Sequence, residues 1–258
     1  MKPSIALLTL LFFLASVEPA IGRTVLISDI DDTVKVSYVF GTGRGIQYFR
    51  NAKARFTGMS ELYNLLEGDQ SGLRVYYVSA APEYLMKNTH DRFLRNGGFP
   101  RGVYVGRTES STETHKLLSI RKILREELPD RVVMIGDDGQ SDAVIYRTIS
   151  RESEFSRIVF DQFIRVVSSR SGPSGSQAGF LTSYDLALEM RARGLIQERS
   201  LRYMHRFILP AILREAPGGD IEDQTENIAF PKFLKCGSFS WKWNVPVLNE
   251  RVKAVCRN

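Results

Sequence analysis

Short apolar runs that alternate with helical segments constrain the fold of this chain more strongly than any other feature. Runs rich in branched and aromatic residues are typical of strands, whereas apolar residues three and four positions apart predict helices. Strands are expected at residues 24–28, 73–78, 102–105, 131–135 and 158–167, and helices at residues 58–67, 83–94, 112–127, 141–148, 183–193 and 199–214. This alternation predicts an α/β fold: a doubly wound, mostly parallel sheet with helices on both faces.

Two aspartates spaced i and i+2 follow the first expected strand. Because side chains alternate along an extended backbone, Asp29 and Asp31 are expected on the same side, with Thr33 after them. One carboxylate could attack a substrate atom while the other moves a proton. The same alternation turns Asp32 away from them. A plain turn after a buried strand is the alternative, since Asp and Thr are common turn residues.

Ser79 and Lys116 add a hydroxyl and a cation to the same edge. Ser79 follows the second expected strand among small residues, where a hydroxyl and main-chain amides suit phosphoryl oxygens. Lys116 opens an amphipathic helix and could point toward that edge, although a solvated helix lysine is the commoner arrangement. Ligands of parallel α/β sheets bind beyond the carboxyl ends of the strands, so these residues predict one site.

A second acidic cluster, Asp137, Asp138 and Asp142, follows the fourth expected strand. Hard oxygen ligands without nearby His or Cys are those that magnesium prefers, so we expect Mg²⁺ with Asp29 and Asp137 as its first ligands. Asp142 would open a helix, where it could be an outer ligand or a favourable charge at the helix N-terminus. A calcium loop is a rival interpretation, but the twelve-residue pattern ending in a bidentate Glu is absent.

The N-terminus has the pattern of a secretory signal peptide. Lys2 precedes an apolar run over residues 5–15, and small residues stand before a cut after Gly22. The run is shorter than the roughly 20 residues of a transmembrane helix, so we expect cleavage and export, to the periplasm or beyond, with an uncleaved anchor as the alternative. Export would place Cys236 and Cys256 where disulfides persist, and we expect a bridge between them.

The net charge of +6 is spread along the chain without a block of like charges, so no nucleic-acid partner is expected. The excess of positive charge suits an anionic substrate or membrane surface, or simply solubility.

The gaps from Thr33 to Ser79 and from Ser79 to Lys116 are too short for a cap domain once helices and strands are subtracted. We therefore expect no large cap and an open site that accepts bulky phosphorylated substrates, lipids at a membrane included. The protein is also expected to be a monomer.

The polar residues named above occur in a fixed order that resembles a known superfamily. Asp29-x-Asp31-x-Thr33, Ser79, Lys116, and Gly136-Asp137 with Asp142 resemble the four motifs of haloacid dehalogenase-like phosphatases, whose fold is Rossmann-like. Residues 28–35, 78–83, 115–124 and 135–146 are more narrowly similar to the catalytic domain of the actin-patch phosphatidate phosphatase family, as a bacterial-type secreted relative. Residues 163–166 and 180–196 extend the similarity. Asp138 and Ala143 depart from it, because relatives usually carry a small residue and a proline there.

The resemblance implies magnesium-dependent hydrolysis of a phosphate monoester through an aspartyl-phosphate. Asp29 would be the nucleophile, and Asp31 the acid and then the base, which requires a raised pKa. Ser79 and Lys116 would hold the transferring group. Asp29, Asp137 and the main chain at Asp31 would hold the metal. Phosphatidate is the expected substrate; soluble or nucleotide phosphates are the first alternative, and a non-catalytic phosphate-binding domain is the second.

We divide the chain into a signal peptide over residues 1–22, a phosphatase domain over residues 23–196, and an extension over residues 197–258. The extension is expected to be helical, closed by the disulfide and packed on the domain. Within it, large apolar residues alternate with polar ones over residues 239–245, which predicts a strand whose aromatic face packs on the domain. Contact of these aromatic residues with a bilayer surface is the alternative.

Overall fold

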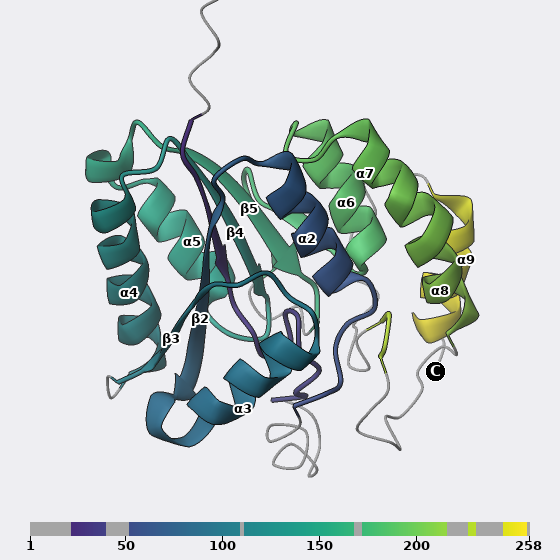
Figure 1. Ribbon diagram of the computed structural model, residues 1–258, viewed down its shortest axis with the longest axis horizontal. Helices are drawn as coiled ribbons and strands as arrows, with labels where there is room; N and C mark the ends of the chain where they lie inside the picture. The colour runs from purple at the N-terminus through teal and green to yellow at the C-terminus, as the bar shows by residue number, and fades with distance from the viewer. Residues whose placement is uncertain are drawn as a thin grey trace, which may run out of the picture.

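The computed structural model describes residues 22–39, 52–108, 111–167, 172–215, 227–230 and 245–256. In this part of the chain, six strands form a single parallel sheet in the order β3-β2-β1-β4-β5-β6 (Figure 1). The predicted α/β fold with a parallel, doubly wound sheet is therefore confirmed. The described connections at the carboxyl edge of this sheet hold no separate cap domain.

Five of the strands lie where the apolar runs predict them, within a few residues at each end. The strands are β1 (Thr24–Ser28), β2 (Arg74–Pro82), β3 (Val103–Arg107), β4 (Arg131–Asp137), β5 (Val159–Arg165) and β6 (Ala178–Phe180). β6 was not expected, because three residues are too few to show a pattern. It is held by pairing with β5, where Phe163 lies opposite Ala178 and Arg165 opposite Phe180.

The predicted helices are also present, and the last of them is interrupted. The helices are α2 (Met59–Asp69), α3 (Glu83–Asn96), α4 (Thr112–Glu127), α5 (Asp142–Ser150), α6 (Ser183–Ala192), α7 (Glu198–Tyr203), α8 (Leu209–Arg214) and α9 (Pro246–Cys256). A 3-10 turn, η1 (Ser153–Phe155), precedes β5, and a π-helical turn, η2 (Met204–Ile208), joins α7 to α8. Pro210 explains the wide turn, since proline lacks an amide hydrogen and its ring clashes with the carbonyl four residues earlier.

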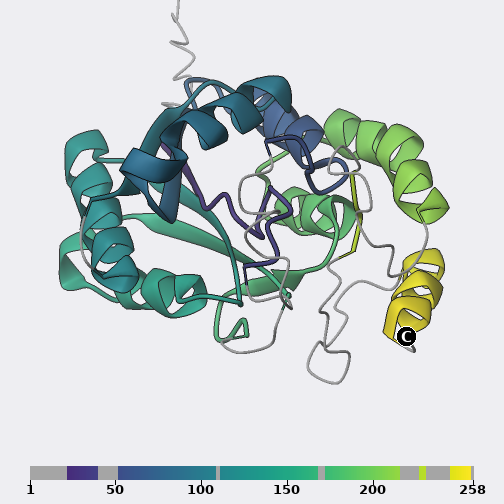
Figure 2. The same ribbon diagram turned by 90° about the horizontal axis from the view of Figure 1, so that it is seen from below.

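Helices cover both faces of the sheet, as Figures 1 and 2 show. The chain runs outward from β1 to β3 and then returns to β4 on the other side of β1. Because crossovers between parallel strands are right-handed, this reversal places α2 and α3 on one face and α4 and α5 on the other. β1 shows the result, since Leu26 packs in the core under α2 while Val25 and Ile27 pack in the core under α4 and α5.

The C-terminal segment shares the core on the α2 face. Met204, Ile208, Ile212 and Leu248 are buried in the same cluster as Leu26. The predicted strand at residues 239–245 lies outside the described residues except for Val245. The Cys236–Cys256 bridge and residues 1–21 of the signal peptide lie outside the described residues or side chains. Of the helices that are described, none is both long and apolar enough to cross a bilayer.

Candidate active site

The carboxyl ends of three neighbouring strands meet at the edge seen in Figure 2. β1 pairs in parallel with β2 on one side and with β4 on the other, so the chain positions that follow these strands come together. The strand order reverses between β1 and β4, and such a reversal is where open α/β sheets bind ligands. Asp29 follows β1 directly, and its amide donates to the carbonyl of Ile135 at 2.9 Å. Asp137 ends β4 beside it.

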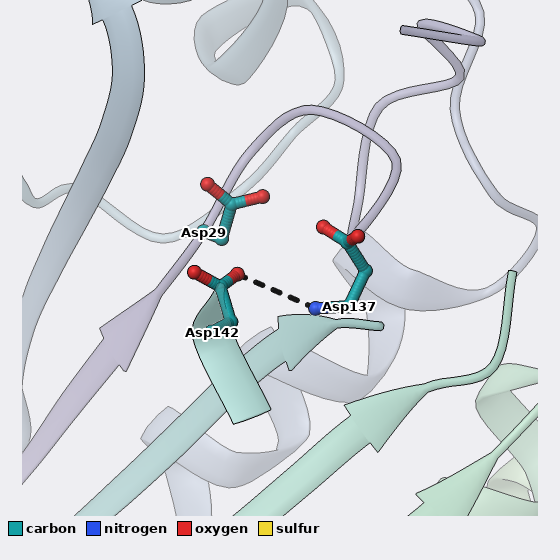
Figure 3. Close-up of side chains that lie close together, drawn as sticks. All are labelled: Asp29, Asp137 and Asp142. Atoms are coloured by element: carbon teal, nitrogen blue, oxygen red, sulfur yellow. Dashed lines mark hydrogen bonds between the residues drawn. The ribbon is translucent and has the colours of Figure 1, made fainter. Parts of the chain in front are cut away.

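Three buried carboxylates lie together at this reversal (Figure 3). Asp29, Asp137 and Asp142 each offer a carboxylate oxygen, and these oxygens lie within 4.8 Å of one another. Asp142 opens α5, and its Oδ2 accepts from the amide of Asp137 at 3.4 Å. Gly136 makes the approach of Asp142 feasible, because a Cβ at this position would lie 2.5 Å from the same Oδ2.

Lys116 belongs to this cluster rather than to solvent. It lies in the first turns of α4, is 3% exposed, and donates from Nζ to Oδ1 of Asp29 at 2.7 Å and to Oδ1 of Asp142 at 2.5 Å. The helix that carries it begins at an N-cap, Ser111, whose hydroxyl accepts from the amide of Thr114. The solvated alternative for Lys116 is therefore wrong.

The cluster carries more negative than positive charge. Burial raises the pKa of Asp29 to about 7; Lys116 opposes this rise, and Asp142 adds to it. Burial, together with Asp142 and Asp29, raises the pKa of Asp137 well above its usual range. Although burial lowers the pKa of Lys116, the two carboxylates it contacts outweigh burial and raise that pKa. One lysine thus faces three carboxylates. The repulsion among these carboxylates can be reduced by protonation or by a bound cation.

The donor set of this cluster fits a hard divalent cation. All three groups are carboxylates, which are ligands that magnesium prefers over the nitrogen and sulfur ligands typical of zinc. Asp142 is thus placed to contribute an oxygen as well as to stand at the start of α5. Asp31 is expected to hold the metal through its main chain, and its carboxylate is not part of this group.

Thr33 and Arg165 tie the first loop to the second acidic loop. The hydroxyl of Thr33 donates to Oδ2 of Asp137 at 3.3 Å, and Nε of the buried Arg165 donates to the carbonyl of Thr33 at 2.9 Å. The guanidinium of Arg165 lies 3.9 Å from the ring centroid of Phe56. Oδ1 of Asp137 accepts from the amide of Gly139 at 2.6 Å, which fixes the carboxylate from its other side.

The environment of Asp31 differs from the one expected. Its Oδ1 accepts from Nζ of Lys35 at 2.9 Å and from the hydroxyl of Ser37 at 2.5 Å, and Nε2 of His90 lies 3.1 Å from its Oδ2. Although burial raises the pKa of Asp31, the charges of Lys35 and His90 outweigh burial and hold that pKa below its ordinary value. The predicted rise in this pKa is therefore wrong.

The reason lies in the backbone after β1. The amides of Val34 and Lys35 both donate to the carbonyl of Ile30, and Asp32 has a φ of 57°. Residues 30–35 thus form a tight turn, so the side-chain alternation of a strand stops at Ser28. The carboxylate of Asp31 then meets Lys35 at the end of this turn and Ser37 just after it, which the alternation rule cannot anticipate.

Two further acidic residues have structural partners. The carboxylate of Asp32 accepts from the amides of Ser37, Tyr38 and Val39 at 2.7 to 3.0 Å. It is therefore outside the cluster, as expected, but the turn and not strand alternation places it there. Asp138 is fully buried, and its Oδ1 accepts from the amide of Val167 at 2.7 Å. Asp138 therefore does not face water.

Ser79 lies within β2, which extends beyond the expected end at Val78 to Pro82. The side chain is fully buried, and its Oγ accepts from the amide of Ala81 at 3.1 Å. The phenol of Tyr104 in β3 also interacts with it. The structure thus brings Ser79 to the strand next to Asp29, with its hydroxyl bonded to the main chain two residues later in the same strand.

The sequence reasoning missed three partners of Asp31: Lys35, Ser37 and His90. A signal for His90 was available, because it lies at helical spacing from Met86 and Leu94, which are buried on the same face of α3. An inward-facing histidine on an apolar face needs a polar partner. Its partner could not be named, because Asp31 lies far away in the sequence.

Comparison with protein-family models gives a match over the part of the chain that carries the site. The family model described as "Phosphatidate phosphatase APP1, catalytic domain" matches residues 24–165. No protein with a curated description matches the chain. Among solved structures, a chain of "Structure of the Pnkp1/Rnl/Hen1 RNA repair complex" is 16% identical with a TM-score of 0.36, over 56% of this chain and 43% of that one. The family match spans more than half of the sequence, and the chain therefore belongs to the phosphatidate phosphatase APP1 catalytic domain family.

Proposed function

We propose that this protein is a magnesium-dependent phosphatase that hydrolyses phosphatidate through an aspartyl-phosphate intermediate. The observation that carries the proposal is Asp29, a buried carboxylate at the end of β1 that contacts Lys116 and lies beside Asp137 and Asp142. The family description supports phosphatidate as the substrate class. The expected signal peptide extends the proposal to an exported protein.

In the first step, a carboxylate oxygen of Asp29 forms a bond to phosphorus while the bond from phosphorus to the leaving oxygen breaks. Asp31 gives a proton to that leaving oxygen. In the second step, Asp31 takes a proton from water, the water oxygen bonds to phosphorus, and Asp29 is released with free phosphate. The lowered pKa of Asp31 suits the base role; the acid role requires that the arriving phosphate dianion raise it.

Lys116 serves both steps by its position between Asp29 and Asp142. It holds the nucleophile, and its charge offsets the negative charge of the transferring group. Ser79 and the amides that follow it are placed one strand away, where they can orient phosphoryl oxygens.

Asp29, Asp137 and Asp142 would hold Mg²⁺, together with the main chain at Asp31. The bound ion supplies positive charge beside the phosphoryl oxygens, a contribution that carboxylates cannot make themselves. The raised pKa values of Asp29 and Asp137 support this assignment, because buried like charges at such separations favour a cation or a proton.

A lipid substrate is supported by the edge around the site. Tyr84, close after Ser79 in the chain, is 91% exposed at the start of α3, and Leu85 beside it is 47% exposed. Such side chains suit the boundary between water and lipid. The net charge of +6 favours approach to an anionic membrane.

The test is phosphate release from phosphatidate in mixed micelles, with magnesium and with a chelator. We expect turnover only with the metal, and its loss in Asp29→Asn. Glu126→Gln, which removes a carboxylate on the exposed side of α4, is the matched control and should retain full activity. Equal turnover in the Asp29 variant, or none in the wild type with any divalent metal, would contradict the proposal. Turnover of soluble phosphates alone would contradict the lipid assignment.

A further inference from the structure

His90 is a fully buried histidine beside the site that the mechanism above does not use. It lies on α3 with an exposure of 0%, on the face that also buries Met86 and Phe93. Its Nε2 lies 3.1 Å from Oδ2 of Asp31, off the line of an ideal hydrogen bond, and its Nδ1 lies 3.2 Å from the hydroxyl of Tyr104. Burying an imidazole is unfavourable unless its nitrogens meet polar groups, so pure packing does not account for this residue.

The carboxylate of Asp31 is approached from two elements of the fold. Lys35 and Ser37 contact Oδ1; Lys35 ends the turn that holds Asp31, and Ser37 follows just after that turn. His90 approaches Oδ2 from α3. With only Oδ1 engaged, the carboxylate could still rotate about that contact; a group at Oδ2 fixes its plane. His90 therefore contributes the contact that ties Asp31 to the rest of the domain.

The contact continues beyond His90. The rings of His90 and Tyr104 meet edge to face, with centroids 5.6 Å apart, and the Tyr104 hydroxyl reaches both Nδ1 of His90 and the side chain of Ser79. A continuous chain of polar groups thus runs from Asp31 to Ser79. Its two ends are the residue assigned to proton transfer and the residue assigned to the phosphoryl oxygens.

We propose that His90 is a positioning residue, which fixes the Asp31 carboxylate for proton transfer to the leaving oxygen while Tyr104 holds its ring. No bond forms or breaks at His90, since the proton passes between Asp31 and the leaving oxygen. The inference rests on the proposed function, because Asp31 has this task only if a phosphoryl group moves to Asp29. Apo structures often show such contacts poorly aligned, and they tighten when substrate binds.

The experiment compares leaving groups that need a proton with one that does not. Nitrophenolate departs unprotonated, whereas the alkoxide of phosphatidate requires an acid. The quantity to compare is kcat/KM. It reports the steps through formation of the aspartyl-phosphate and does not depend on how fast that intermediate is hydrolysed. For His90→Leu we expect kcat/KM on phosphatidate to fall about tenfold or more, which is part of the roughly 100- to 10,000-fold that acid catalysis contributes. On para-nitrophenyl phosphate, the change should stay within roughly twofold by the same reasoning.

Three other variants separate positioning from folding. His90→Gln returns an amide nitrogen near the place of Nε2 and should regain most of the lost activity. Tyr104→Phe keeps the ring and removes the hydroxyl, and it should reduce phosphatidate turnover selectively. His205→Leu is the matched control, because Nδ1 of His205 also meets a tyrosine hydroxyl, that of Tyr184 at 2.8 Å, in the C-terminal segment. This variant should leave kcat/KM unchanged on both substrates.

Each result decides the proposal. If His90→Leu lowers kcat/KM equally on the two substrates, or does not lower kcat/KM on phosphatidate, the role of His90 is refuted and the proposed function is left intact. If His90→Leu fails to fold, the same substrate ratio in Tyr104→Phe decides, and an unchanged ratio there refutes the proposal. A wild type without turnover, or turnover that survives Asp29→Asn, would refute the proposed function and the role of His90 with it.

Discussion

Replacing Asp29 by Asn should stabilise the metal-free protein at alkaline pH, even though it removes the proposed nucleophile. Burial raises the pKa of Asp29 from an ordinary 3.8 to about 7, although Lys116 opposes the rise. A carboxyl whose pKa is raised in the folded state stabilises the fold while it is protonated. Its contribution is complete below about pH 4 and is lost as the pH rises through about 7. Asn has nearly the shape of the protonated carboxyl and does not titrate.

The size of the effect follows from the two pKa values. The interval between 3.8 and about 7 corresponds to on the order of 4 kcal/mol in the free energy of unfolding. Near pH 4 the variant and the wild type should be about equally stable. By pH 8 the variant should be the more stable of the two, by up to that amount. Asp31 does not disturb the comparison, because its pKa is lowered and its contribution is constant over this window.

Urea denaturation followed by circular dichroism, in a chelator at several pH values, measures the difference. Magnesium should narrow this difference at pH 8, because an ion bound only to the folded wild type adds about 2.7 kcal/mol at a concentration of about one hundred times its Kd, against a difference of up to about 4 kcal/mol. Glu126→Gln should follow the wild type throughout. A wild type more stable than Asp29→Asn at pH 8 without metal, or a difference independent of pH, would refute this account of the cluster.

Three further substitutions test the surroundings of the cluster. Gly136→Ala should lower magnesium affinity in calorimetric titration and cost about 1 to 3 kcal/mol of stability, since its Cβ would meet Asp142 at 2.5 Å; unchanged affinity would contradict the close approach. Lys116→Met should abolish turnover and lower the free energy of unfolding at pH 8 by about 3 to 5 kcal/mol, because the Asp29 carboxylate loses its buried partner. Asp32→Ala leaves three amides without their acceptor and should cost about 1 to 3 kcal/mol in urea denaturation while metal affinity is retained.

The sequence predicted the architecture well because β1 and its neighbours are buried on both faces and therefore read as continuous apolar runs. It predicted the place of Asp29, Ser79 and Asp137 because each lies at or near the carboxyl end of an expected strand, and the carboxyl ends of adjacent parallel strands meet at one edge. β6 is too short to carry a pattern and depends on pairing with β5.

The surroundings of Asp31 could not be predicted in the same way. A rule of alternation applies only to extended backbone, and the chain turns after Ser28. The contact with His90 joins residues that are distant in sequence, and it forms only because α3 crosses the edge where β1 ends. The two departures at Asp138 and Ala143 have different outcomes: Asp138 is bonded to the amide of Val167, and Ala143 is simply buried in the core.

Trapping the covalent intermediate tests the central claim most directly. Protein mixed with magnesium and phosphatidate carrying a radiolabelled phosphate is quenched in acid during the first turnover, and the labelled peptide is identified by mass spectrometry. The proposed mechanism predicts label on Asp29, sensitive to hydroxylamine as an acyl phosphate is, and none in Asp29→Asn. Steady turnover with no label on the protein, or label on another residue, would contradict it.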